Sequence, residues 1–246
     1  MIRVRIIRAR GSTPREEGAE MMVGPNTVTG TIGGGQLEYL AIDRARMMLA
    51  KDETQARMDV PLGPDIGQCC GGRVELALDR AAATVPVPGP AILIFGAGHV
   101  GRALARALLP LPFAPRLIDQ RAAELSLAAP GVPTTLTPLP EAELRAAPSA
   151  ASFVIVTHDH ALDFLLGVEA LARPDAPYIG MVGSRTKRAT FDRFARSHGA
   201  DPARLVCPIA AGFPRDKRPE VIAAFTAAEI AARLLTHAPA PALHAP

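Results

Sequence analysis

Residues 91–101, AILIFGAGHVG, join an unbroken apolar run to a glycine-rich turn and the start of a helical segment. Five consecutive apolar residues without alternation are typical of a strand buried on both faces of a parallel sheet. In the turn that follows, Gly96 permits a tight reversal, Gly98 lets the backbone approach a phosphate, and Gly101 allows the helix to pack closely on the strand. The stretch therefore predicts a Rossmann-type strand–turn–helix unit whose helix start can bind an anion.

The sequence after this turn alternates short apolar runs with helical segments. Strands are expected at residues 116–119, 132–136, 153–157 and 178–182, and helices at residues 98–109, 161–172, 186–197 and 219–235. In the last helix we expect one buried stripe made of Val221, Phe225, Ala228, Ala232 and Leu235. Alternation of strand and helix predicts a doubly wound parallel sheet.

The first part of the chain has a different pattern. Residues 2–7 alternate arginine with aliphatic side chains, which indicates a half-buried strand, and residues 36–50 are rich in helix formers. Further short strands are expected at residues 19–23, 28–29 and 73–78. Three prolines and a glycine within residues 83–90 mark a boundary between domains. We therefore expect a smaller α+β domain at residues 1–85, a Rossmann-like domain at residues 90–237 and a flexible tail at residues 238–246.

Composition limits the function classes. Of the 246 residues 48% are hydrophobic and 21% charged, so the chain can form a sizeable core and is not disordered as a whole. No apolar run approaches the roughly 18 residues that a membrane helix needs. The net charge is only +3 and aromatic residues make up 4%, so we expect no nucleic-acid partner. Three cysteines, Cys69, Cys70 and Cys207, fit a reducing cytoplasm better than a secreted disulfide framework.

Titratable side chains follow the expected strand at residues 153–157. His158, Asp159 and His160 come directly after it, and in an open α/β sheet the carboxyl ends of the strands are where ligands bind. Imidazole and carboxylate groups here could bind a metal or move protons. The alternative is an exposed loop in which Asp159 caps the next helix.

Basic residues follow the next expected strand and open another helix. Gly183 and Ser184 precede Arg185 and Lys187. Because the start of a helix disfavours cations, their presence there favours a bound oxyanion or phosphate, with a solvated basic face as the alternative.

Two more glycine-rich loops lie in the first part of the chain. Residues 30–38, GTIGGGQLE, lead into a helix, for which a flexible hairpin end is the alternative interpretation. Residues 67–72, GQCCGG, place Cys69 and Cys70 between glycines. Such thiols would be accessible, and a disulfide between neighbours would be strained, so a soft metal or sulfur transfer suits them.

Taken in order, these motifs resemble the XdhC/CoxF family over nearly the whole chain. Residues 11–15, 30–38 and 67–72 are similar to its N-terminal domain, and residues 95–101, 157–160, 180–187 and 207–209 to its Rossmann domain. The resemblance implies an accessory factor of xanthine and carbon monoxide dehydrogenases. Such a protein is a chaperone rather than a turnover enzyme; it binds molybdenum cofactor, supports its sulfuration and delivers it to an apo molybdenum hydroxylase.

The resemblance also implies molybdopterin as the cofactor, and an apo xanthine dehydrogenase-type hydroxylase and a cysteine desulfurase as partners in the cytoplasm. A homodimer is a further expectation, and a membrane partner is not expected. Cys69 and Cys70 would face the metal. The expected cofactor-binding residues are Gly33, Gly34, Gly35, Gln36, Cys69, Cys70, Gly96, Gly98, His99, Gly101, Asp119, His158, Asp159, His160, Gly183, Ser184, Arg185 and Lys187.

Two other functions remain open at this point. An NAD(P)-dependent oxidoreductase could use the same glycine-rich turn, with Asp119 on the ribose and His158 or His160 as acid or base. A nucleotide-sensing regulatory module is the other. Neither function accounts for the glycine-rich loops and the paired cysteines of the first domain.

Overall fold

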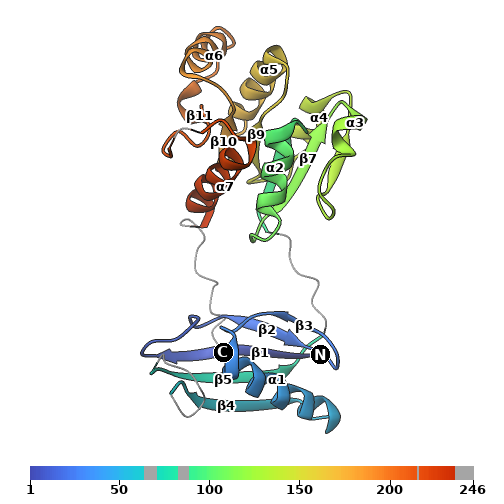
Figure 1. Ribbon diagram of the computed structural model, residues 1–246, viewed down its shortest axis with the longest axis vertical. Helices are drawn as coiled ribbons and strands as arrows, with labels where there is room; N and C mark the ends of the chain where they lie inside the picture. Colours follow the sequence, from blue (N-terminus) through green and yellow to red (C-terminus); the bar gives the residue numbers. More distant parts are fainter. Residues whose placement is uncertain (64–70, 83–88, 215, 236–246) are drawn as a thin grey trace. The chain divides into compact units, whose positions relative to one another are not determined.

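The computed structural model describes residues 1–63, 71–82, 89–214 and 216–235. The chain divides into two compact units, residues 1–86 and 87–240, and Figure 1 shows that each has its own sheet. The expected α/β class, with a Rossmann-like parallel sheet preceded by a smaller α+β unit, is confirmed. The loop with Cys69 and Cys70 and the tail expected at residues 238–246 lie outside the described residues.

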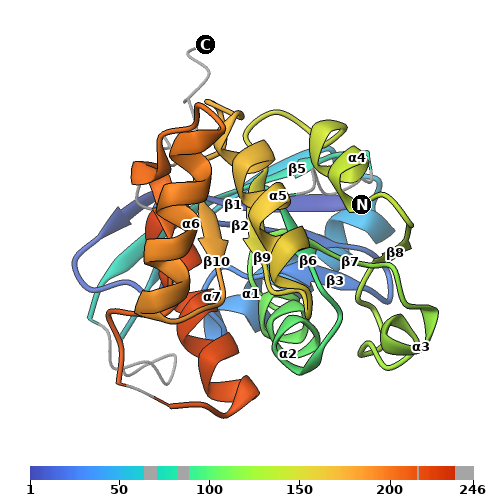
Figure 2. The ribbon, with the colours of Figure 1, turned by 90° about the horizontal axis from the view of Figure 1, so that it is seen from above.

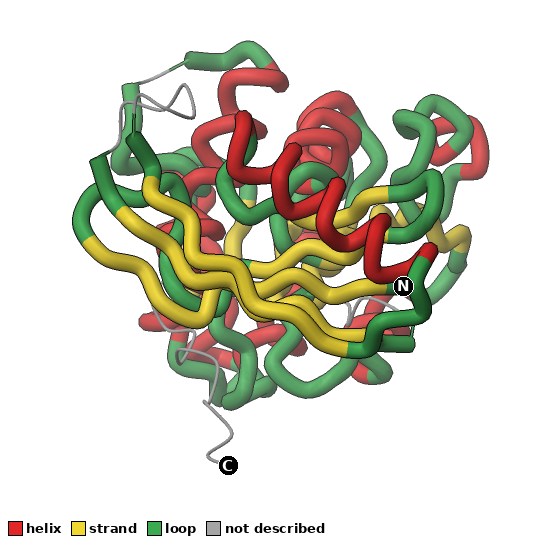
Figure 3. The backbone as a smooth tube through the Cα atoms, turned by 90° about the horizontal axis from the view of Figure 1, so that it is seen from below, coloured by secondary structure: helices red, strands yellow, loops and turns green. Residues whose placement is uncertain are grey.

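The first unit is a five-stranded antiparallel sheet with one long helix along it (Figure 3). In the order β3-β2-β1-β5-β4, its strands are β3 (Val28–Gly30), β2 (Glu20–Val23), β1 (Ile2–Arg10), β5 (Arg73–Arg80) and β4 (Gln55–Pro61). Alternation along β1 buries Ile2, Val4 and Ile6, while α1 (Gly35–Ala50) packs Leu37 and Met48 against them. One amphipathic helix thus covers the apolar face of the sheet.

The second unit is a six-stranded parallel sheet in the order β11-β10-β9-β6-β7-β8. Its strands are β6 (Ala91–Phe95), β7 (Ala114–Asp119), β8 (Thr134–Leu136), β9 (Ser152–Ile155), β10 (Ile179–Met181) and β11 (Leu205–Val206). Read from β8 to β11, this is the 3-2-1-4-5-6 order of Rossmann folds. The direction of winding reverses between β6 and β9, so a crevice is expected at the carboxyl ends of these two strands.

Helices cover both faces of the parallel sheet (Figure 2). On one face α2 (His99–Leu108) and α7 (Pro219–Leu235) share a core with β6 and β9. On the other, α4 (Pro140–Arg145), α5 (His160–Leu171) and α6 (Arg185–Ser197) pack around Phe95, Phe153 and Phe191. The short α3 (Ala122–Leu125) follows β7. Within the described ranges, no helix combines the length and apolar character needed to span a bilayer.

The buried face of α7 differs from the expected stripe. The structure buries Ala223, Thr226, Ala227 and Ile230, whereas Ala228, Ala232 and Leu235 are exposed. The helix is so rich in alanine that more than one face is apolar, and sequence periodicity cannot choose between them. Close packing of α7 against α2 makes the choice.

A pair of truncations on α7 tests this correction. Ile230→Ala removes a fully buried side chain and should lower the free energy of unfolding by about 2–5 kcal/mol. Leu235→Ala, at a position that is 49% exposed, should cost clearly less. Urea denaturation of both variants measures the difference. A larger loss for Leu235→Ala than for Ile230→Ala would mean that the sequence-based stripe is right, and equal losses would contradict the burial described here.

Candidate functional site

The glycine-rich turn lies at the reversal point between β6 and β9. Gly96 has φ +114°, and a Cβ there would lie 2.4 Å from the carbonyl oxygen of Val156, just beyond β9. A Cβ on Gly101 would lie 1.8 Å from the carbonyl oxygen of Gly96. These two glycines therefore permit strand and helix to pack closely. A Cβ on Gly98 would meet nothing within 4 Å, so its backbone is open to a ligand.

Asp119, at the end of β7, holds this turn in place. Its buried carboxylate accepts a 2.6 Å hydrogen bond from the backbone N–H of Ala97 and a bidentate pair of 2.9 Å bonds from the Arg121 guanidinium. Burial alone would raise the pKa of Asp119, but the hydrogen bonds from Arg121 and Ala97 outweigh it and lower the pKa. The expected role of Asp119 as a ribose ligand needs correction, because its oxygens are already occupied within the protein.

The crevice itself is a cavity of about 440 Å³. Gly98 and His99 at the start of α2 line it, as do His158 after β9 and Arg121. No side chain of the described residues caps the start of α2, and the first turn of this helix contains no acidic residue. Backbone N–H groups at a helix start that lack a capping side chain are well placed to bind an anion.

The structure separates the roles of the three residues that follow β9. Asp159 caps α5, since its carboxylate accepts from the N–H groups of Ala161 and Leu162. His158 is exposed and lines the crevice, whereas His160 is the first residue of α5. Among the residues described, no cluster of three His, Cys, Asp or Glu side chains is arranged to hold a metal ion. The cap expected as the alternative is thus the observed role of Asp159.

Asp163 and Lys187 form a buried ion pair between α5 and α6. The Lys187 ammonium donates to Asp163 Oδ2 and, at 2.9 Å, to the carbonyl oxygen of Val182. Asp163 Oδ1 accepts from the N–H and the hydroxyl of Thr157, at 3.1 and 2.7 Å. The side chains of Asp163 and Lys187 are 0% and 8% exposed. Lys187 was expected to bind an anion with a free charge; its charge instead belongs to an internal pair.

The other residues of this basic segment face a second cavity, of about 560 Å³. Gly183, Ser184 and Arg185 line it, and the Ser184 hydroxyl also caps α6 by accepting from the N–H of Lys187. Its other walls come from residues 208–214 and the start of α7, which were not among the expected cofactor-binding residues. The resemblance at residues 207–209 was the signal in the sequence that pointed to this segment.

The triple-glycine loop of the first unit is held by a residue that was not on the expected list. Glu38 Oε1 accepts from the Thr31 hydroxyl and from the N–H groups of Ile32 and Gly34, at 3.0 and 2.9 Å. Burial opposes the charge on Glu38, but these hydrogen bonds outweigh it and lower the pKa. The N–H of Gly34 is therefore used within the loop. Gly33 is closed in by Pro14, while a Cβ on Gly34 would meet open space.

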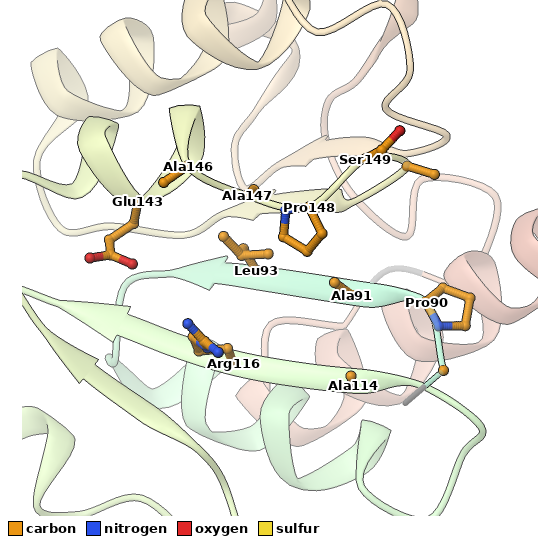
Figure 4. A pocket seen from close by; sticks show the side chains of 12 residues that line it. Pro90, Ala91, Leu93, Ala114, Arg116, Glu143, Ala146, Ala147, Pro148 and Ser149 are labelled. Carbon is orange, nitrogen blue, oxygen red and sulfur yellow. The ribbon is translucent and has the colours of Figure 1, made fainter. Parts of the chain in front are cut away.

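A cavity of about 670 Å³ lies at the amino ends of the strands of the parallel sheet, opposite the crevice (Figure 4). It is lined by the starts of β6 and β7 and by the end of α4, mostly with alanine and proline. Arg116 and Glu143 are its charged residues. Because it lies at the amino ends of the strands, away from every expected site residue, we do not place the function there.

The buried ion pair gives a prediction on stability. Lys187→Met should lower the free energy of unfolding by about 3 kcal/mol, because the Asp163 carboxylate would remain buried without its partner. Arg145→Met is the matched control, since Arg145 and Glu169 form a solvent-exposed pair. Chemical denaturation checks both. Lys187→Met as stable as Arg145→Met would show that the buried pair contributes nothing.

Comparison with known proteins agrees with this architecture. A model of the XdhC Rossmann domain matches residues 92–230, and a model of the XdhC and CoxI family matches residues 1–60. The uncharacterized protein YqeB of Escherichia coli K12 is 29% identical over 243 residues, which cover 92% of this chain and 42% of that relative. This chain thus spans less than half the length of that relative.

A crystal structure described as a xanthine dehydrogenase from Bacillus halodurans superposes with a TM-score of 0.80. The alignment covers 98% of this chain and 93% of that one at 17% sequence identity, and it shows a shared fold. The Rossmann-domain match alone spans more than half of the residues, in the unit with the 3-2-1-4-5-6 strand order. The chain therefore belongs to the XdhC family.

Proposed function

We propose that this chain is an accessory factor for xanthine dehydrogenase-type molybdenum hydroxylases and that it holds molybdenum cofactor by its phosphate. The single observation that supports this most is the start of α2, where the open backbone of Gly98 and N–H groups without a capping side chain face the crevice. Family membership supplies the link to these enzymes.

The charges around the crevice suit a phosphate. Arg121 lines it, and the acidic groups nearby are compensated: Asp119 by Arg121, and Glu124 by an ion pair with Arg102. His99 and His158 add side chains that can donate hydrogen bonds. A dianion entering the crevice would thus meet backbone N–H groups and compensated ion pairs rather than a free carboxylate.

In this proposal the chain binds and releases a cargo. The cofactor supplies the redox-active molybdenum centre, and the residues of the chain orient it by the phosphate. Cys69 and Cys70, outside the described residues, remain the proposed contacts at the metal end. An apo hydroxylase and a cysteine desulfurase remain the proposed partners.

The nicotinamide-dependent alternative gains no support from Asp119. Its oxygens accept from Arg121 and Ala97, so they are not free to select the hydroxyls of an unphosphorylated ribose.

Titration with NADH, beside purification from cells that make molybdenum cofactor, separates the two functions. Saturable NADH binding together with a protein free of molybdenum and pterin would favour the oxidoreductase.

Substitutions at Gly98 test the phosphate contact. Gly98 is the N-cap of α2, where asparagine and aspartate are both favourable, so Gly98→Asn and Gly98→Asp should both fold. Only aspartate places a negative charge against the phosphate, and we expect it to retain about tenfold less cofactor than the asparagine variant. Molybdenum and pterin content after purification gives the result. Equal retention in wild type and both variants would remove the phosphate from this crevice.

Serine substitutions test the thiols. Cys69→Ser and Cys70→Ser remove soft ligands, so at least one variant should lose molybdenum and activate an apo hydroxylase poorly, with a near-native melting temperature. Cys207→Ser is the matched control. Cys207 is partly buried, and burial raises the pKa of its thiol despite the nearby Lys187 and Arg188 charges, so it is a poor thiolate ligand. If Cys69→Ser and Cys70→Ser both carry cofactor and activate the client like wild type, these thiols have no such role.

A further inference from the structure

We propose that the cavity between the start of α6, residues 208–214 and the start of α7 is a second ligand site. The geometry points to a planar heteroaromatic group with an anionic substituent. This site goes beyond the phosphate crevice, because its walls and charges do not include Gly98 or the start of α2. The two cavities share Val182, so they adjoin at the end of β10.

One side of the cavity is apolar and aromatic. Phe213 and Phe225 stack with ring centroids 4.7 Å apart and an angle of 6° between their planes. Ile209, which is buried, and Ile222 extend this lining. Flat aromatic surface of this kind favours a planar ring, because stacking adds to the burial of apolar area. An inorganic anion alone would leave this part of the cavity unused.

The other side carries positive charge that no described acid compensates. Arg185 and Lys217 line the cavity and make no ion pair with any residue of the described ranges. Asp216 is the acidic residue in the lining, and hydrogen bonds from Arg218 satisfy it and lower its pKa to about 2. By contrast, Lys187 and Arg188 on the same helix are paired with Asp163 and Asp192. Arg185 and Lys217 are thus left to bind an anion.

A buried network fixes the segment that forms the wall. Tyr178 donates from its hydroxyl to Glu229 Oε1 at 2.5 Å, and the N–H of Ala210 donates to Glu229 Oε2 at 3.1 Å. Burial, together with the Glu229 charge, raises the pKa of Tyr178, so the hydroxyl remains a donor. Ala210 is held at φ +58°, a conformation that alanine rarely adopts. A wall fixed before binding loses little entropy when the ligand enters.

These features select one kind of ligand. The volume of about 560 Å³ is in the range of small-molecule sites. A neutral apolar compound would leave Arg185 and Lys217 unused, whereas a flat ring with a phosphate or carboxylate meets both parts of the lining. Pterins and nucleotides share this chemistry.

Two probes distinguish a pterin site from a nucleotide site. Binding of pterin-6-carboxylate is followed by the anisotropy of its own fluorescence, and binding of AMP is followed by calorimetry. The chain contains no tryptophan, so the protein adds little background fluorescence. The test variant is Arg185→Gln combined with Lys217→Gln. The matched control is Arg193→Gln combined with Arg196→Gln, which removes the same charge from exposed positions of α6 outside the cavity. Ala211→Trp, at an exposed lining position, fills the cavity without removing charge.

We expect at least one probe to bind wild type, with affinity about tenfold lower in the test variant, near wild type in the charge control, and strongly reduced in Ala211→Trp. Tighter binding of pterin-6-carboxylate than of AMP identifies a pterin site, and the reverse order a nucleotide site. Probe binding that is lost in Gly98→Asp but kept in the test variant would place the probe in the crevice at α2 and overturn this proposal, so failure of the crevice and failure of this site are told apart. Absence of binding by both probes up to about 1 mM, or equal binding by the test variant and its control, overturns the proposal.

Discussion

The carboxyl edge of the parallel sheet depends on one buried carboxylate. Asp163 receives the Lys187 ammonium on one oxygen and the N–H and hydroxyl of Thr157 on the other. Through these bonds the end of β9, the first turn of α5 and the first turn of α6 are held together. Neither charge could remain buried alone, since a buried ion without its partner costs several kcal/mol. Both cavities at this edge are therefore bordered by segments that the pair fixes in place.

The same device recurs in three other loops of the described residues. Asp119 fixes the glycine-rich turn, Glu229 fixes the segment around Ala210, and Glu38 fixes the triple-glycine loop, each by accepting backbone N–H groups. A carboxylate can accept several such bonds, and that makes it an effective anchor for irregular backbone. Asp119 is also paired with the Arg121 guanidinium, which compensates its negative charge beside the crevice.

Local patterns in the sequence predicted the parts of the fold that depend on local interactions. The apolar run at β6, the three glycines after it and the strand–helix alternation each predicted a structure that the chain forms. The strand β4 was not expected, although Ala56, Met58 and Val60 alternate with polar residues there in the pattern of a half-buried strand. The stripe on α7 was wrong because alanine is apolar on any face. β11 is two residues long and forms through pairing with β10, which no local pattern predicts.

The sequence predicted where the candidate site lies, but it did not predict which of the charged side chains form internal ion pairs. Sequence placed Arg185 and Lys187 together at a helix start, yet only a buried partner 24 residues earlier decides that Lys187 is internal, while Arg185 has no ion-pair partner among the described residues. Asp119 was likewise expected at a strand end, but the neighbouring Arg121 occupies its oxygens. Such pairings depend on tertiary contacts, so residue type and spacing do not reveal them.

The division between internal and free charges has a consequence for a protein that would hand its cargo on. An anion held by backbone N–H groups and one or two exposed cations gives up few buried interactions when it leaves. Had Lys187 been the ligand, release would strand an ammonium inside the protein and bind the cargo more tightly. By pairing Lys187 with Asp163 and leaving Arg185 and Lys217 at the surface, the fold keeps the second cavity, between the starts of α6 and α7, cationic without a buried charge that an anion would leave unpaired on release. A site with fixed walls, and with cations that water can solvate once the anion has left, is expected of a protein that binds its ligand reversibly.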